Sequence, residues 1–136
     1  MPRTIVLIDD DTDDLDAMKE AIDQVDSTLL CISFSHAEVA LRLLGKELVV
    51  LPDFIFIDVN MPKISGKECL TILRKSPELT ETLIIMHSTT LPIDIAKSYL
   101  ASGASYTFQK PYAFSDYLRI LEEIIIKDIP APQHIR

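Results

Sequence analysis

Five short runs of apolar residues are spread along the chain, and each has the length of a β-strand. A continuous apolar run is typical of a strand that is covered on both faces, as in a parallel sheet. A strand with one face in water alternates apolar and polar residues instead. The runs cover residues 4–8, 29–34, 54–57, 83–86 and, more weakly, 106–108. The pattern therefore predicts five parallel strands.

The segments between the runs carry apolar residues at the period of an amphipathic helix. These stripes fall within residues 15–25, 39–44, 69–73, 95–100 and 114–125. Five β–α units in succession predict one α/β domain over residues 3–127. We expect a flavodoxin-like (βα)5 three-layer sandwich, with a five-stranded parallel sheet in the strand order 2-1-3-4-5. Residues 128–136 are expected to form a short tail, too short for an effector domain.

Local signals for helix ends agree with this fold. Ser35 and Ser65 each precede a glutamate by three residues, which predicts a capping box at both positions. Thr12 is placed to cap the first helix. Gly45 and Gly103 lie where a helix end favours a left-handed residue. Each signal falls at an edge of a predicted helix.

Composition excludes several functional classes. Hydrophobic residues make up 48% of the 136 residues, so we expect a folded core. Thirteen basic against 21 acidic residues give a net charge of −8, which disfavours direct DNA binding and attachment to an anionic membrane. No apolar run approaches the roughly 20 residues of a membrane span. Two cysteines, Cys31 and Cys69, suit buried thiols in a reduced cytoplasmic setting better than a disulfide framework.

The acidity is concentrated near the N-terminus. Six aspartates lie within eight positions: Asp9, Asp10, Asp11, Asp13, Asp14 and Asp16. Without these six the net charge would be −2 instead of −8. The last three fit the first turns of a helix, where acidic side chains are favourable. Asp9 and Asp10 follow directly on an apolar run, so helix capping does not account for them.

Polar residues stand at the carboxyl ends of four predicted strands, the edge where open α/β sheets bind ligands. They are Asp9 and Asp10 after the first strand, Asp58 after the third, Ser88 after the fourth and Lys110 after the fifth. Carboxylates in one cleft repel one another unless a cation holds them, and oxygen ligands suit a hard ion such as Mg²⁺. Asp58 is then a candidate nucleophile for phosphoryl transfer. Lys110 would supply a second cation and Ser88 a hydroxyl.

His87 adjoins Ser88 and could be taken for a catalytic base. If Ser88 points into the cleft, the alternation of side chains along a strand turns His87 toward the other face. We therefore expect His87 to be a structural residue.

Four sequence elements together resemble the receiver domain of two-component response regulators. They are I-V-L-I-D-D-D, P-D-F-I-F-I-D-V-N-M-P-K-I-S-G, I-I-M-H-S-T and G-A-S-Y-T-F-Q-K-P. The second element is highly specific, because it joins a strand, an aspartate, a Met-Pro pair and a glycine at the distances expected for that family. The resemblance covers residues 3–127.

The resemblance implies a phosphorylation site. Asp58 would be the phosphoacceptor, modified to 4-aspartylphosphate, with Ser88 and Lys110 at the positions that contact the phosphoryl group. The phosphodonor would be a sensor histidine kinase or a histidine phosphotransfer protein in a phosphorelay. Such a domain is a signalling module and not an enzyme, apart from its own phosphorylation and dephosphorylation.

The resemblance also implies a metal cofactor and a mode of output. Asp10 would bind Mg²⁺ or Mn²⁺ directly, and Asp9, close by, would bind it directly or through water. Asp58 and the backbone carbonyl of Asn60 would be further ligands. The protein would be a stand-alone response regulator that signals by protein–protein interaction through its fourth helix, fifth strand and fifth helix.

One position departs from the family pattern. Three residues before the lysine the family usually has a tyrosine or phenylalanine, and this chain has Thr107. The aromatic Tyr106 is displaced by one position, which points it to the other face of the strand. We therefore expect that Thr107 cannot report activation as an aromatic ring would.

Three alternatives remain at this point. A haloacid-dehalogenase-like phosphatase also uses an aspartate, a hydroxyl, a lysine and Mg²⁺, but its nucleophile would be Asp9, at the end of the first strand. A flavodoxin-type electron carrier shares the fold, yet three aspartates after the first strand would repel the phosphate of its flavin. A degenerate receiver could act only as an interaction module.

Overall fold

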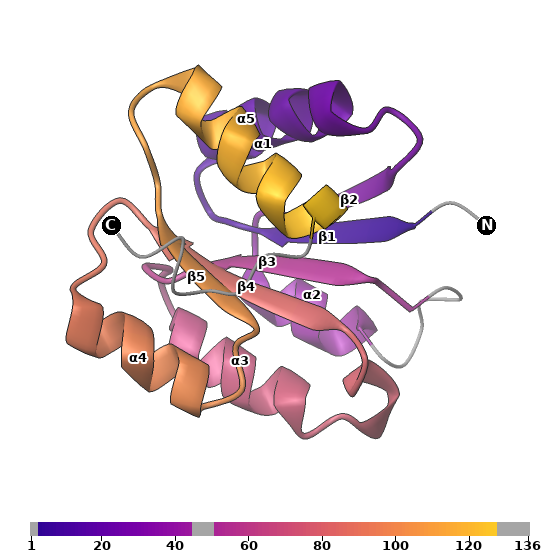
Figure 1. Cartoon of the computed structure of the whole chain (residues 1–136). Coiled ribbons are helices and arrows are strands. Elements are labelled where there is room, and N and C mark those ends of the chain that lie inside the picture. The colour runs from indigo at the N-terminus through magenta and orange to yellow at the C-terminus, as the bar shows by residue number, and fades with distance from the viewer. Residues whose placement is uncertain (1–2, 45–50, 128–136) are drawn as a thin grey trace.

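Five parallel strands form a sheet in the order β2-β1-β3-β4-β5, which confirms the predicted order (Figure 1). The computed structural model of the chain describes residues 3–44 and 51–127. The strands are β1 (Thr4–Ile8), β2 (Leu30–Phe34), β3 (Phe54–Asp58), β4 (Leu83–Ser88) and β5 (Tyr106–Gln109). Each lies on one of the predicted apolar runs, and β1 is flanked by β2 and β3.

Helices cover both faces of the sheet and complete the three layers (Figure 1). On one face lie α1 (Thr12–Val25) and α5 (Phe114–Glu122), and on the other lie α2 (Ala37–Leu43), α3 (Gly66–Arg74) and α4 (Ile93–Ala101). A 3-10 turn over Pro77–Leu79 follows α3, and a π-helical turn over Glu123–Lys127 extends α5. None of the helices within the described residues is long and apolar enough to cross a membrane.

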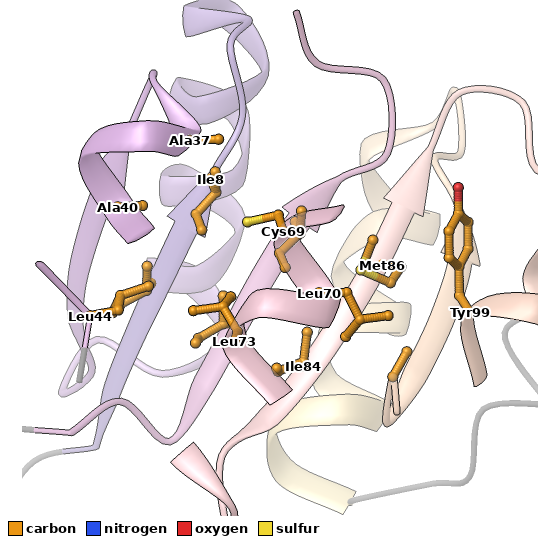
Figure 2. Packing of buried hydrophobic residues seen from close by; sticks show 14 of the residues in the cluster. Ile8, Ala37, Ala40, Leu44, Cys69, Leu70, Leu73, Ile84, Met86 and Tyr99 are labelled. Carbon is orange, nitrogen blue, oxygen red and sulfur yellow. The ribbon is translucent and has the colours of Figure 1, made fainter. Parts of the chain in front are cut away.

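Alternate residues of each strand supply the two cores. Ile8, Ile84 and Met86 face α2, α3 and α4, where they pack with Leu70 and Leu73 of α3 (Figure 2). The residues between them belong to the cluster beneath α1 and α5. Fully burying an aliphatic side chain contributes about 1.5–3 kcal/mol relative to its exposure to water. Two such layers hold the strands, and therefore the residues at their ends, in fixed positions.

The two cysteines are free thiols. Cys69 of α3 is buried in the core shown in Figure 2, as predicted for a structural thiol. Cys31 of β2 is only partly buried, contrary to the expectation of a buried thiol, because β2 is an edge strand of the sheet.

The predicted capping box at Ser65 is confirmed, and the one at Ser35 is wrong. The Ser65 hydroxyl accepts from the amide of Glu68 at 3.2 Å, and the Glu68 carboxylate accepts from the amide of Ser65 at 3.2 Å. Helix α2 has His36 as its N-cap, without a side-chain cap. The Ser35 hydroxyl instead contacts Nδ1 of His36 at 3.0 Å, because the helix begins one residue later than predicted.

Helix α1 is capped by Asp11 and not by Thr12, so the prediction for Thr12 is wrong. Asp11 is extended, and its carboxylate accepts from the amides of Asp13 at 2.9 Å and Asp14 at 3.3 Å. Thr12 is already the first helical residue. The connection from β1 to α1 therefore consists of Asp9 and Asp10, followed by the capping residue Asp11.

Two glycines are required by backbone geometry. Gly103, after α4, has a φ of 110°, which confirms the left-handed residue predicted there. Gly66, at the start of α3, lies so close to β3 that a Cβ atom would be 2.8 Å from the Cα of Val59 and 2.9 Å from the carbonyl oxygen of Asp58. Gly66 thus sets the distance between α3 and the backbone of Asp58. Gly45, the other predicted helix end, lies outside the described residues.

We expect Gly66→Ala to destabilise the fold by about 1–3 kcal/mol, because the new methyl group meets backbone atoms that cannot rotate away. Urea unfolding followed by circular dichroism measures this. Thr71→Ala, on the exposed side of the same helix, is the matched control and should change stability by about 0.5 kcal/mol or less. An equal effect of both substitutions would contradict the close approach.

Candidate functional site

The carboxyl ends of four strands bring the polar residues predicted from the sequence to one edge of the sheet. Asp9 follows β1, Asp58 and Ser88 end β3 and β4, and Lys110 follows β5. In the register of β3 and β4, Asp58 pairs with His87. The backbone amide of Lys110 donates to the carbonyl of Ser88 at 2.8 Å, which ties the end of β5 to β4.

The ammonium of Lys110 lies among three carboxylates. Its Nζ is 3.1 Å from Oδ2 of Asp9, 2.8 Å from Oδ2 of Asp14 and 3.6 Å from Oδ1 of Asp58. The side chain of Lys110 is only 9% exposed, so water screens its contacts with the buried Asp9 and Asp58 little. Sequence reasoning missed Asp14, which it assigned to the start of the helix. The position of Asp14 in the first turn of α1, directly after the acidic loop, could have indicated that it lies near the strand ends.

Burial is the largest influence on the pKa of both strand-end carboxyl groups, Asp9 and Asp58. It raises the pKa of Asp9, which is fully buried, although the amide of Asp11, at 3.0 Å, and the ammonium of Lys110 lower it. Burial, followed by the charge of Asp9, raises the pKa of Asp58 to about 6, against the opposing effect of Lys110. The negative charge at this edge therefore exceeds what one ammonium compensates.

The donor set fits a hard divalent cation. Asp9 and Asp58 offer buried carboxylates, and Asp10 is exposed beside them, with a charge that also raises the pKa of Asp58. Carboxylates that outnumber the single ammonium of Lys110 are the arrangement that a bound Mg²⁺ or Mn²⁺ would stabilise. Asn60, two residues after Asp58, lies on the exposed loop at the same edge.

Within residues 3–44 and 51–127, the hydroxyl hydrogen of Ser88 has no acceptor. Its Oγ accepts from Nδ2 of Asn60 at 3.0 Å and from the backbone amide of Thr90 at 3.4 Å. The residue is fully buried. With both contacts made to the oxygen, the hydroxyl hydrogen can point to another acceptor.

His87 packs on the face predicted for it but remains close to the carboxylates. Its ring stacks on Phe108, with centroids 5.2 Å apart and planes 9° apart, and meets the edge of Phe56 at 6.3 Å. Burial and the nearby Lys110 charge lower its pKa well below the ordinary value. One ring nitrogen, however, lies within 4.8 Å of a carboxylate oxygen of Asp9 and of Asp58. Sequence alternation indicated the face of the strand and could not indicate this proximity.

Thr107 is fully buried in β5 beside Met86 of β4. Its hydroxyl finds no hydrogen-bond partner among the described residues. Tyr106 belongs to the opposite core, with Phe108 and Tyr117, so the aromatic side chain does point to the other face as expected.

A family model described as the response regulator receiver domain matches residues 5–122. The chain belongs to the response regulator receiver domain family. Receiver domains are signalling modules, which agrees with the expectation of a phosphoacceptor and disfavours the phosphatase and the electron carrier. The resemblance seen in the sequence motifs is confirmed.

The curated relatives of this receiver domain are longer proteins. It is 28% identical over 120 residues to the DNA-binding transcriptional regulator NtrC of Proteus hauseri, which covers 88% of this chain and 24% of NtrC. It is 29% identical over 119 residues to the transcriptional regulatory protein MalR of Bacillus subtilis, covering 88% of this chain and 48% of MalR. The chain thus spans less than half the length of either relative.

Solved structures show the same receiver fold. The phosphorylated cyanobacterial phytochrome response regulator RcpA superimposes with a TM-score of 0.79, at 23% identity and with 91% of each chain covered. At this identity the likeness establishes the fold alone.

We expect Asp58→Asn to stabilise the metal-free receiver domain at neutral pH. The pKa of Asp58 is about 6 in the folded chain and near 3.8 when unperturbed, so the folded chain binds more protons between these values. Stability therefore falls as pH rises through this window, and a neutral amide removes that loss. The gain at neutral pH is on the order of 1–3 kcal/mol and disappears below about pH 4. Urea unfolding across this pH range in chelator measures it.

Asp16→Asn is the matched control, because Asp16 is exposed on α1. It should give no comparable pH-dependent gain. A loss of stability for Asp58→Asn at neutral pH would mean that the site favours the ionised carboxylate without a metal, contrary to the account above.

Proposed function

We propose that Asp58 accepts a phosphoryl group from the phosphohistidine of a sensor histidine kinase or histidine phosphotransfer protein. The observation that carries this proposal is the position of Asp58, at the end of β3 with its side chain 10% exposed and Lys110 at 3.6 Å. A buried carboxylate beside a cation is a poised nucleophile for phosphorus. With a pKa of about 6, Asp58 is mostly ionised at neutral pH.

In the transfer step an oxygen of Asp58 attacks the phosphorus in line with the donor nitrogen. The P–O bond forms while the P–N bond breaks, and the donor imidazole leaves with the electron pair. The product on this chain is 4-aspartylphosphate. Because the phosphoryl group adds about −1.5 to −2 charge, it competes with Asp14 for the ammonium of Lys110. The free hydroxyl hydrogen of Ser88 is available to a second phosphoryl oxygen.

Asp9, Asp10, Asp58 and the backbone carbonyl of Asn60 are the residues that would hold Mg²⁺ or Mn²⁺. The bound ion would neutralise charge on the phosphoryl oxygens during transfer. The uncompensated carboxylates described above support this assignment.

Signal output would be protein–protein interaction in the cytoplasm, without direct DNA binding or membrane attachment by this domain. The net charge of −8 supports this. On the expected output surface of α4, β5 and α5, Ile93 is 59% exposed, and Tyr112, in the segment before α5, is fully exposed. Large exposed apolar side chains of this kind are typical of interaction surfaces.

Incubation with a small acyl phosphate and Mg²⁺ should label Asp58, as mapped by mass spectrometry. Asp58→Asn should remove the label and Asp16→Asn should keep it, while Lys110→Met should slow labelling about 100-fold. Chelation of Mg²⁺ should abolish labelling.

Label on Asp9 would favour the phosphatase alternative. If the intact chain neither takes label nor binds beryllofluoride with Mg²⁺, it acts only as an interaction module.

Thr107→Val should stabilise the domain by about 1 kcal/mol, because it removes a buried hydroxyl without a described partner at nearly constant volume. It should leave the response to beryllofluoride intact, whereas Ser88→Ala should weaken it. Unfolding curves and NMR spectra with and without beryllofluoride measure both effects. An inward movement of Thr107 on activation that reshapes α4 would contradict the proposal that Thr107 does not report activation.

A further inference from the structure

His87 is a buried polar side chain that the proposed function does not use. It is fully buried, and neither ring nitrogen has a hydrogen-bond partner among the described residues. A neutral imidazole carries one donor and one acceptor, and leaving a buried donor or acceptor unpaired is unfavourable. An unpaired buried group of this kind calls for an explanation such as a bound ion or water.

The position of the ring points toward the strand ends. Stacking on Phe108 fixes the plane of the imidazole, and pairing of β3 with β4 sets His87 beside Asp58. One ring nitrogen and one carboxylate oxygen each of Asp9 and Asp58 all lie within 4.8 Å of one another. A candidate nitrogen ligand for a metal ion therefore lies beside the buried carboxylates of Asp9 and Asp58.

We propose that Asp9, Asp58 and His87 bind Zn²⁺. Two carboxylate oxygens and an imidazole nitrogen are common Zn²⁺ ligands, whereas Mg²⁺ prefers oxygen alone. Zn²⁺ binds these atoms at about 2.0–2.2 Å, so adjacent ligand atoms in a formed site lie about 3–3.5 Å apart. Rotation of the two aspartate side chains can supply the remaining approach, and a water molecule would complete the tetrahedron.

The ammonium of Lys110 has to leave Asp9 when the ion enters. Asp14 offers it another partner, since its carboxylate already lies 2.8 Å from Nζ and is 39% exposed. Entry lies on the side of Asp58 and Lys110, whose side chains are 10% and 9% exposed.

Zn²⁺ in this position would occupy the carboxylate of Asp58 and block its phosphorylation. This consequence rests on the proposed function, whereas the binding itself does not. The site would make the domain sensitive to borderline transition-metal ions in a way that a site built from oxygen ligands alone is not.

Calorimetric titration of the metal-free intact chain with Zn²⁺, without phosphodonor, tests the site. We expect one equivalent to bind, and His87→Phe, which keeps the aromatic stack, to weaken Zn²⁺ binding about tenfold or more. Mg²⁺ affinity should change about twofold or less in the same variant, because Mg²⁺ prefers oxygen ligands. His36→Gln, at the exposed N-cap of α2, is the matched control and should bind Zn²⁺ like the unmodified chain. Equal Zn²⁺ affinity of His87→Phe and the unmodified chain would overturn the proposal.

A measurement on the unmodified chain does not depend on the folding of any variant. Long-range ¹H–¹⁵N spectra should show one ring nitrogen of His87 shifting as one equivalent of Zn²⁺ is added. A response confined to the other histidines would overturn the proposal. If Zn²⁺ binds at His87 but Asp58 takes no label from an acyl phosphate in a separate sample with Mg²⁺ and without Zn²⁺, this inference stands and the proposed function is rejected.

Discussion

Repulsion between the buried carboxylates of Asp9 and Asp58 is the constraint on which the site depends. The apolar layers on both faces of the sheet fix the ends of β1 and β3, so the two groups cannot move apart far enough to relieve it. Lys110 compensates part of the charge and is itself shared with Asp14. Burial, followed by this repulsion, raises the pKa of Asp58 to about 6, and the remaining negative charge leaves the edge receptive to a cation.

The same constraint links the site to the rest of the fold. Gly66 lets α3 begin against the backbone of Asp58, and the hydrogen bond from Lys110 to the carbonyl of Ser88 joins β5 to β4. A change in charge at Asp58 therefore acts on loops that are each anchored to a different strand. Asn60 lies on the loop after β3, Ser88 is the last residue of β4, and the two side chains contact each other directly.

Much of this arrangement could be predicted from the sequence, because continuous apolar runs define buried strands and the residue after each run must stand at a strand end. That reasoning located Asp9, Asp58 and Lys110 without any structure. It missed the contact of Asp14 with Lys110, which depends on the orientation of α1 against β5. It placed His87 on the correct face but could not see its nitrogen near Asp58, because strand register is a long-range property. The errors at Thr12 and Ser35 came from helix starts that differ from the predicted position by a single residue, which local capping patterns do not resolve.

Uncompensated carboxylates at the strand ends make Asp58 responsive to a divalent cation. Carboxyl ¹³C NMR titration of Asp58, with and without Mg²⁺, tests it most directly. We expect a pKa near 6 in the metal-free chain and a value well below that with Mg²⁺ bound. A pKa of Asp58 close to that of an exposed aspartate, unmoved by Mg²⁺, would contradict it.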